Sequence, residues 1–227
     1  MKITDNMEVV ISGYGRMGHL VEEVLIRKGI AVALATEDIC SVDKELAKRC
    51  VCIDFTTPEA FRANYRSLAS NFKAVVVGTT GWNDIAGSVI SCFEECGTPM
   101  IYSSNFSIGV NALFAALRKA GEVLSGHGYD VSVTEIHHVH KLDKPSGTAK
   151  TIASIIGEVT GSEPLIESQR IGEVPGTHTA VFSSDVDRIT FTHEAYSRQG
   201  FAEGAVVAAE MTEGLKGVHE FSELILK

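Results

Sequence analysis

Three histidines and two lysines lie between residues 137 and 144, a density of proton donors and fixed cations that suits acid–base chemistry on an anionic ligand. A histidine can change protonation near neutral pH, whereas a lysine keeps its charge and attracts a carboxylate. Taken alone, such a cluster favours a solvated polar loop with a capping serine. The segments on either side of it favour a binding site.

A strand is predicted to lead into the cluster. Apolar side chains recur with period two at Tyr129, Val131 and Val133, as they do in a strand with one covered face. The histidines should therefore emerge at the end of this strand.

A helix is predicted to follow the cluster. Pro145 blocks any helix running in from upstream, and Ser146 can cap the helix that comes next. We expect the first amides of this helix, at Gly147 and Thr148, to be unpaired and to suit a substrate carboxylate. The apolar face of the helix comprises Ala149, Ile152, Ala153, Ile155 and Ile156.

The start of the chain carries a glycine-rich turn between a predicted strand and a predicted helix. The apolar residues 8–11 run into a Gly-x-Gly-x-x-Gly pattern at Gly13, Gly15 and Gly18. In dinucleotide-binding units these glycines permit a tight turn, the approach of a pyrophosphate and close packing of the helix on the sheet. A tight turn alone would explain the glycines, but the order strand, glycines, helix favours dinucleotide binding. The helix presents Met17, Leu20, Val21, Val24 and Leu25, and Gly29 ends it.

An acidic residue about 20 positions beyond such glycines holds the ribose hydroxyls of the cofactor. The second predicted strand, residues 30–35, ends just before Glu37 and Asp38. Glu37 is the first choice and Asp38 the second, although either could cap the next segment. A carboxylate repels a 2′-phosphate, so we expect NADH to be preferred over NADPH. An inward-folded Lys44 or Lys48 would oppose this preference.

Further strands and helices alternate with short connections, which predicts an α/β fold with a Rossmann-type doubly wound parallel sheet. Its ligand edge lies at the carboxyl ends of the strands. The predicted strands are 50–55, 73–77 and 99–102, and the predicted helices are 58–70 and 85–96, with a short helix at most within 42–49.

The pattern changes in the second half of the chain. A long apolar helix is predicted over residues 112–124, and a final helix over residues 202–215. Between them, residues 177–182 and 188–192 alternate apolar and polar side chains, as strands of a mixed or antiparallel sheet do.

We therefore expect two domains. A dinucleotide-binding domain should span residues 1–105, and residues 209–227 should return to it. A second, α+β domain for substrate binding and oligomerisation should span residues 106–208.

Composition excludes several classes of function. A formal net charge of −9 argues against nucleic acid as a partner, because phosphate contacts require a basic surface. No apolar run is long enough to cross a membrane, and residues 1–6 are not followed by a signal-peptide core, so we expect a cytoplasmic protein. Five cysteines are an odd number, and without an export signal we expect no disulfide framework. We interpret Cys50, Cys52, Cys92 and Cys96 as core thiols and expect no metal site.

Taken together, these segments resemble the dihydrodipicolinate reductase family of lysine and diaminopimelate biosynthesis. The most specific motif is the run from Glu135 to Ala149, with its His-His-x-His-Lys and Pro-Ser-Gly-Thr elements. The resemblance covers nearly the whole chain. Its other motifs are residues 13–18, 54–60, 78–81 and 105–111, with a fainter match at Arg170, Gly172, Gly176, His178, His193, Arg198, Phe201 and Ala205.

The resemblance implies roles for individual residues. It implies that His137 is the proton donor, that Lys141 is the second catalytic group, and that His138, Ser146, Gly147 and Thr148 bind substrate carboxylates. The cofactor-binding residues that it implies are Gly13, Tyr14, Gly15, Arg16, Met17, Gly18, Glu37, Gly78, Thr79, Thr80, Ser103, Ser104, Asn105 and Phe106.

The implied reaction is the NAD(P)H-dependent reduction of 4-hydroxy-tetrahydrodipicolinate, a small dicarboxylate imine. The nicotinamide donates hydride to C4 of a cyclic, conjugated imine, and the resulting enamine must be protonated, which requires a donor with a pKa near neutrality. The family resemblance and the alternating strands also predict a homotetramer built through the sheet of the second domain. The chain departs from the family at Lys144, in a short segment after the second strand, and in having no arginine after Glu37.

Two other functions compete with this one. A dehydrogenase of another amino or imino acid needs the dinucleotide loop but not Lys141 with Gly147 and Thr148. A regulatory protein that only senses the cofactor would have a degraded catalytic run, whereas His137, His138 and Lys141 are all present.

Overall fold

The computed structural model describes residues 7–226, which divide into two units. The first unit contains the chain up to Ser107 together with Gln199–Ile225, and the second contains Ile108–Arg198. The chain returns to the first unit at Gln199, earlier than the expected residue 209. Residues 1–6, considered above for an export signal, lie outside the described residues.

Within the described chain, the sheet of the first unit is parallel and has the strand order β10-β5-β4-β3-β1-β2. The order reverses at β1, so the carboxyl ends of β1 and β3 form the switch point at which such sheets bind nucleotides. The predicted Rossmann-type doubly wound sheet is confirmed. Its strands are β1 (Glu8–Ser12), β2 (Ala31–Thr36), β3 (Cys50–Asp54), β4 (Ala74–Val77), β5 (Met100–Tyr102) and β10 (Val218–Glu220).

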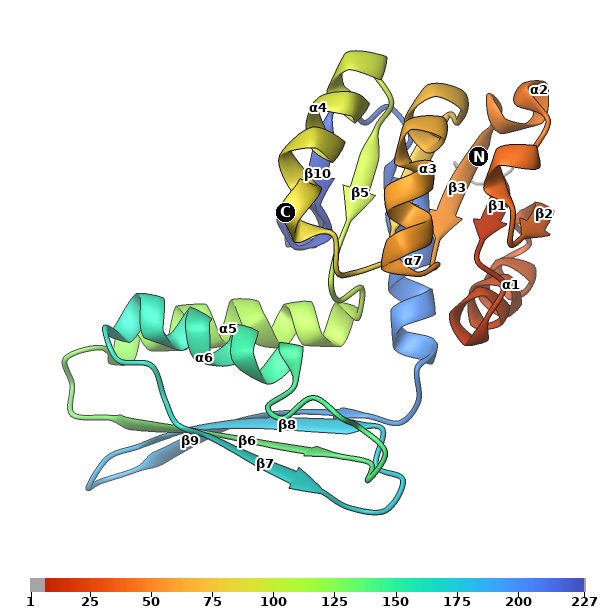
Figure 1. Cartoon of the computed structure of the whole chain (residues 1–227). Coiled ribbons are helices and arrows are strands. Elements are labelled where there is room, and N and C mark those ends of the chain that lie inside the picture. The colour runs from red at the N-terminus through yellow and green to blue at the C-terminus, as the bar shows by residue number, and fades with distance from the viewer. Residues whose placement is uncertain (1–6, 227) are drawn as a thin grey trace. The chain divides into compact units, whose positions relative to one another are not determined.

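Helices pack on both faces of this sheet (Figure 1). The helices α1 (Arg16–Lys28) and α7 (Gln199–Met211) pack on the face that carries Val9 and Ile11. The opposite face, which carries Val10, is covered by the remaining large helices. These are α3 (Pro58–Asn71) and α4 (Ala86–Cys96), and the short elements are α2 (Lys44–Ala47), α8 (Phe221–Ile225) and 3-10 turns at Ile39–Ser41 and Asn83–Ile85.

The ends of these helices follow from their sequence. Gly29 ends α1 in a left-handed conformation, with φ of 72°, which glycine adopts without steric strain. Thr57 caps α3 by accepting a hydrogen bond from the amide of Ala60, and Pro58 occupies its first position. Helix α7 starts at Gln199 and ends at Met211, where the sequence had predicted a final helix over residues 202–215.

The second unit contains a mixed four-stranded sheet with the order β7-β6-β8-β9. Strand β7 is parallel to β6, and the remaining pairs are antiparallel. The strands are β6 (Asp130–His137), β7 (Ile166–Arg170), β8 (Gly176–Ser183) and β9 (Arg188–Ala195). This confirms the predicted α+β unit, although β7 was not predicted, because its sequence Ile-Glu-Ser-Gln-Arg is almost entirely polar.

Two helices, α5 (Ile108–Leu124) and α6 (Gly147–Thr160), lie on one face of this sheet (Figure 1). The apolar core between helices and sheet includes Leu117, Ile156, Val133 and Phe182. Helix α5 starts earlier than the predicted residue 112.

Strand alternation places polar residues on the same covered face. In β6, Val133 is followed at period two by Glu135 and His137, and all three are buried. In β8, His178 occupies the equivalent position opposite Glu135. Three ionisable residues, Glu135, His137 and His178, therefore lie on the face of the sheet that the helices cover, where the other buried residues are apolar.

The structure also bears on the predictions about the cysteines and about membrane-spanning segments. Cys50 and Cys52 are buried and Cys92 is partly buried, but Cys96 is exposed and is not a core thiol, because it is the last residue of α4. Among the described residues, no helix combines the length and the apolar character that a bilayer crossing requires.

Candidate active site

Glu135 and His137 form a contact at the carboxyl end of β6. They are two residues apart on one strand, so their side chains lie on the same face. The Oε2 atom of Glu135 lies 2.5 Å from Nδ1 of His137. Glu135 is completely buried and His137 is 7% exposed, so water screens this contact very little.

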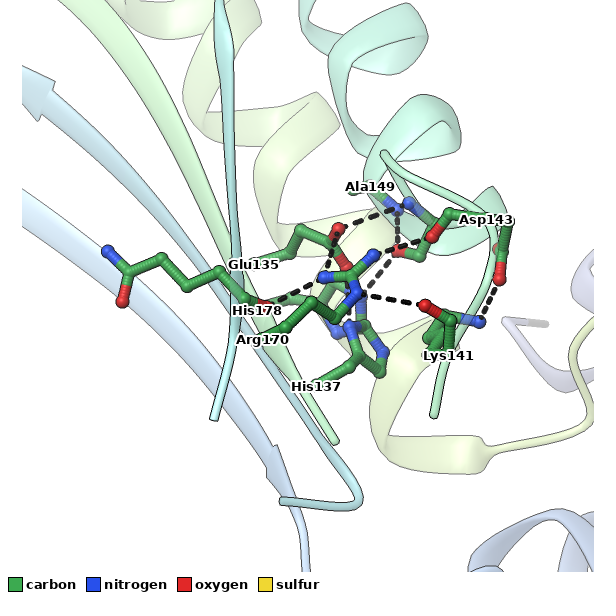
Figure 2. Close-up of polar contacts among 9 residues, drawn as sticks. Glu135, His137, Lys141, Asp143, Ala149, Arg170 and His178 are labelled. Carbon is green, nitrogen blue, oxygen red and sulfur yellow. Dashed lines mark hydrogen bonds and ion pairs between the residues drawn. The ribbon is translucent and has the colours of Figure 1, made fainter. Parts of the chain in front are cut away.

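Arg170 binds the other oxygen of the same carboxylate (Figure 2). Its Nη1 atom donates to Oε1 of Glu135 at 3.0 Å. The parallel pairing of β6 with β7 places Arg170 beside His137. The guanidinium also donates to the carbonyl oxygens of Lys141 at 3.3 Å and Asp143 at 2.5 Å. One arginine thus ties the strand that carries His137 to the loop that carries Lys141.

The Lys141 side chain forms an ion pair with a residue of its own loop. Its Nζ atom lies 2.8 Å from Oδ1 of Asp143. The hydrogen bond from Lys141, assisted by the backbone of Gly147, holds the pKa of the Asp143 carboxyl below its usual value. For Gly147 the expectation of an unpaired amide is therefore wrong, because the Asp143 carboxylate accepts a hydrogen bond from it.

Ser146 connects the start of α6 to the buried cluster. Its hydroxyl caps the helix by accepting from the amide of Ala149 at 3.2 Å, as predicted. The same hydroxyl lies 3.2 Å from Nε2 of His178, and the amide of Ser146 donates to Oε1 of Glu135 at 3.3 Å. The loop before Ser146 contains a cis peptide bond between Lys144 and Pro145.

Burial disfavours the charged form of the two buried histidines, His137 and His178. Burial lowers the pKa of His178 to about 4, with the neighbouring His137 adding to the effect. Burial also lowers the pKa of His137, although the carboxylate of Glu135 opposes this shift. Despite its burial, the Glu135 carboxyl has a lowered pKa, because hydrogen bonds from Ser168, Ser146 and Arg170 favour its ionised form.

The other residues of the histidine cluster lie outside this network. His138 is partly exposed, and His140 pairs with Glu173 at 3.1 Å on the surface. Glu135, His137 and His178 could each offer a ligand atom to a metal ion. Because the guanidinium of Arg170 already neutralises the Glu135 carboxylate, this cluster is better suited to proton transfer than to binding a cation.

In the first unit, the glycine-rich turn has the shape that a dinucleotide requires. Gly13 has φ of 87°, and a Cβ atom at this position would lie 2.4 Å from the carbonyl oxygen of Phe55. A Cβ at Gly18 would lie 2.3 Å from the carbonyl oxygen of Gly13. Among the described residues, by contrast, no atom comes within 4 Å of such a position at Gly15, so a phosphate could reach the start of α1 there.

Glu37 lies against the same turn. Its Oε1 atom accepts a hydrogen bond from the amide of Tyr14 at 2.6 Å. Tyr14 packs its ring on His19, with ring centroids 4.0 Å apart, and its hydroxyl donates to Glu22. Among the remaining predicted residues of the turn, Arg16 is exposed and Met17 is half-buried.

Asp54 joins three loops at this edge of the sheet. Its buried carboxylate accepts hydrogen bonds from Ser12 at 2.7 Å, Thr79 at 2.6 Å and Thr56 at 3.0 Å. Burial raises the pKa of this carboxyl against these hydrogen bonds. The hydroxyl of Thr79, a predicted cofactor-binding residue, is therefore engaged in holding the loops together.

The remaining predicted cofactor-binding residues differ in how accessible they are. Gly78 lies under the Phe55 ring, and a Cβ atom there would come within 2.1 Å of it. Thr80 and Ser104 are exposed, and Ser103 bonds to the backbone of Asn105. The Phe106 side chain is 2% exposed and lies in the core beside Phe221. The ring of this predicted cofactor-binding residue is therefore not available at the surface.

Sequence reasoning missed four residues that organise these sites. Glu135 was available, because a residue two positions before His137 on a strand shares its face. His178 and Arg170 come from other strands, and their places depend on sheet register, which no local pattern predicts. Asp54 could have been found as the one acid in a buried strand end.

Both halves of the chain match the same family by sequence. The family profile described as dihydrodipicolinate reductase, N-terminus, matches residues 7–106, and the one described as dihydrodipicolinate reductase, C-terminus, matches residues 109–225. The 4-hydroxy-tetrahydrodipicolinate reductase of Christiangramia forsetii is 37% identical over 96% of this chain and 98% of its own length. That of Methanoculleus marisnigri is 35% identical over 92% of this chain and 94% of its own length.

Solved structures show the same fold. A dipicolinate-bound dihydrodipicolinate reductase from a Paenisporosarcina species superimposes with a TM-score of 0.78, covering 94% of this chain and 97% of the other, at 22% identity. An engineered D-amino acid dehydrogenase bound to NADP+ gives a TM-score of 0.56 at 16% identity. At these identities the likeness concerns the fold alone.

The depressed pKa of His178 predicts a loss of stability in acid. In the unfolded chain a histidine binds its proton near pH 6.5, whereas His178 in the folded chain does so only near pH 4. Stability from this group is therefore complete above pH 6.5 and is lost as the pH falls toward 4. Between pH 7 and pH 5 we expect a loss of about 2 kcal/mol, measured by urea unfolding. The variant His178→Gln should lack this part of the pH dependence, and an equally steep dependence in both proteins would contradict the assignment.

Proposed function

The chain belongs to the dihydrodipicolinate reductase family, and from this premise we propose how its two units divide the reaction. The protein is an NAD(P)H-dependent oxidoreductase that reduces 4-hydroxy-tetrahydrodipicolinate in lysine and diaminopimelate biosynthesis. The first unit binds the dinucleotide, and the second, over Ile108–Arg198, binds the substrate. A cytoplasmic location forms part of the same proposal.

The dinucleotide is held at the glycine-rich turn of the first unit. The open space at Gly15 and the start of α1 support a pyrophosphate position there. Glu37 holds the ribose, and the loops after β4 and β5, residues 78–80 and 103–106, border the rest of the cofactor. When bound, the dinucleotide supplies the hydride, and residues of the chain bind the substrate and move the proton.

The substrate is held at the end of β6 and the start of α6. A dicarboxylate requires cations and amide donors, which Lys141, His138, Gly147 and Thr148 provide, with Ser146 fixing the start of the helix. Because the Asp143 carboxylate now occupies Lys141 and Gly147, a substrate carboxylate takes over these two partners.

His137 donates the proton and Lys141 stabilises charge. The observation that carries this assignment is the contact of His137 with the buried carboxylate of Glu135, in the same network that fixes the Lys141 loop. A carboxylate beside an imidazole stabilises the protonated imidazolium, which is the form that can donate a proton. The ammonium of Lys141 remains positive beside the carboxylates and the ring on which charge develops.

The whole assignment is tested by following nicotinamide absorbance when the protein meets freshly generated 4-hydroxy-tetrahydrodipicolinate. Oxidation of the cofactor that depends on this substrate is the expected result. Activity with another amino or imino acid in its place would favour the competing dehydrogenase, and cofactor binding without oxidation would favour a sensor.

The roles of His137 and Lys141 predict different kinetic effects. The variant His137→Gln should lower kcat by roughly 10²–10⁴-fold with a smaller change in KM, because it removes a positioned acid. The variant Lys141→Ala should raise KM as well as lower kcat, because its charge acts on both bound substrate and transition state. Steady-state kinetics with saturating cofactor measure both effects.

Cofactor binding provides the control for both variants. Neither residue belongs to the dinucleotide loops, so NADH should bind both variants as it binds the unmodified protein. Near-normal turnover in His137→Gln would mean that the proton comes from Lys141, His138 or water.

The surroundings of Glu37 predict a preference for NADH over NADPH. Its carboxylate can accept hydrogen bonds from ribose hydroxyls but repels a 2′-phosphate. The ammonium of Lys48 could have compensated the charge of a 2′-phosphate, but it pairs instead with Glu45 at 2.7 Å. We expect kcat/KM to be higher with NADH when the two cofactors are compared at the same substrate concentration. Equal values, or a higher value with NADPH, would show that another cation meets the phosphate.

We also propose that the protein is a homotetramer built through the sheet of the second unit. One face of this sheet carries α5 and α6, while the other leaves Ile136 and Val181 only partly covered. Such a face can be covered by other copies of the chain. Light scattering at micromolar concentration should therefore give the mass of four chains, and a monomer at low salt would refute the proposal.

A further inference from the structure

We propose that Glu135 is a positioning residue, which holds His137 through Nδ1 so that Nε2 delivers the proton. This inference rests on the proposed role of His137 as the donor. It assigns to the buried carboxylate a part in the reaction, in addition to its part in the fold.

The contact between the two side chains leaves each atom one partner. Oε2 of Glu135 and Nδ1 of His137 lie 2.5 Å apart, and both atoms are shielded from solvent. Within the described chain, neither atom meets the geometry of a hydrogen bond with any group, so this ion-pair contact is what each atom has in its place. A buried polar atom without a partner is unfavourable by about 1–3 kcal/mol, so separating these two side chains would destabilise the protein.

The second oxygen of the carboxylate is fixed from the opposite side. Oε1 of Glu135 accepts from Arg170 at 3.0 Å and from the amide of Ser146 at 3.3 Å. With Oε1 bound to two donors, the carboxylate cannot turn away from His137 without leaving a buried charge unpaired. Its orientation, and with it that of the imidazole, is therefore determined by β7 and the start of α6.

The other nitrogen of His137 faces a position that has no side chain. A Cβ atom at Gly176 would lie 3.0 Å from Nε2 and 3.2 Å from Cδ2 of the ring. The His178 ring stands edge-on to the His137 ring, with centroids 5.0 Å apart. Glycine at position 176 thus leaves room beside the nitrogen that is not bound to Glu135.

The proton transfer follows from this arrangement. The imidazolium of His137 carries protons on Nδ1 and Nε2, and the carboxylate compensates its charge. When Nε2 passes its proton to the enamine carbon, the Nδ1 proton stays directed at Glu135, so a single neutral tautomer results. Glu135 remains ionised throughout, because Arg170 and Ser146 stabilise its charge.

The competing interpretation is that Glu135 serves the fold alone by pairing with Arg170. That role would make stability depend on Glu135 but would leave the protonation of His137 unchanged. The two interpretations therefore differ in the pH profile, in the tautomer and in the coupling between Glu135 and His137.

The variant Glu135→Gln separates these interpretations. We expect kcat at neutral pH to fall on the order of 10–100-fold, a part of the 10²–10⁴-fold that a positioned acid contributes, with little change in KM. Loss of the carboxylate lowers the pKa of His137, so the fall in activity on the alkaline side should begin at a lower pH. The matched control is Glu173→Gln, which alters the exposed pair with His140 and should leave the profile unchanged.

A double-mutant cycle tests whether Glu135 acts through His137. In a His137→Gln background, Glu135→Gln should cause little further loss of kcat, whereas independent roles would multiply the two losses. Multiplying losses, or an unshifted pH profile in Glu135→Gln, would overturn the proposal.

Nitrogen NMR of His137 in the unmodified full-length protein gives a test that needs neither activity nor a stable variant. The neutral ring should carry its proton on Nδ1, and a proton on Nε2 would overturn the proposal even if Glu135→Gln fails to fold. If the tautomer is as expected but His137→Gln is fully active, the assignment of the donor fails, and not the positioning by Glu135.

Discussion

The second unit depends on one buried, ionised carboxylate. Glu135 is completely enclosed, and an isolated carboxylate there would be strongly unfavourable. Arg170, the amide of Ser146 and Nδ1 of His137 together make the charge tolerable. These partners come from β7, from the start of α6 and from β6 itself, so the carboxylate forms the point at which three elements must meet. Removing Arg170 alone would leave a buried charge, which makes the pair hard to alter one residue at a time.

The first unit also contains a buried carboxylate, but its hydrogen-bond donors are of a different kind. Asp54 also lies buried at a strand end, but its partners are the hydroxyls of Ser12, Thr56 and Thr79, and none of them is charged. Burial raises the pKa of Asp54 in spite of these hydrogen bonds, whereas hydrogen bonds from Ser168, Ser146 and Arg170 outweigh burial and lower the pKa of Glu135. Asp54 fixes the loops at the edge of the parallel sheet, and Glu135 contacts the histidine that we propose as the proton donor.

Much of this architecture was readable from the sequence, for reasons that are local. The glycine-rich turn, the Ser146 cap and the period-two pattern of β6 each depend on neighbouring residues, and their elements were predicted to within a few positions. The features that the sequence did not predict depend on contacts between residues far apart in the chain or on loop conformation. The polar strand β7 exists because β6 offers it an edge, and the partnership of Arg170 with Glu135 depends on that pairing. The engagement of Gly147 by Asp143 follows from a loop conformation that residue types alone do not determine.

The position of Asp143 has a consequence for the charge balance of the substrate loop. Lys141 carries its own counterion two residues along the chain, so its ammonium is already compensated before a ligand arrives. On the proposed role of Lys141, one carboxylate of the substrate exchanges with that of Asp143, so the charge in direct contact with the ammonium stays the same. The released Asp143 side chain is exposed and regains its hydration in water. Ligand entry is thus an exchange of anions at a neutral pair, in which the loop never has to hold a bare cation.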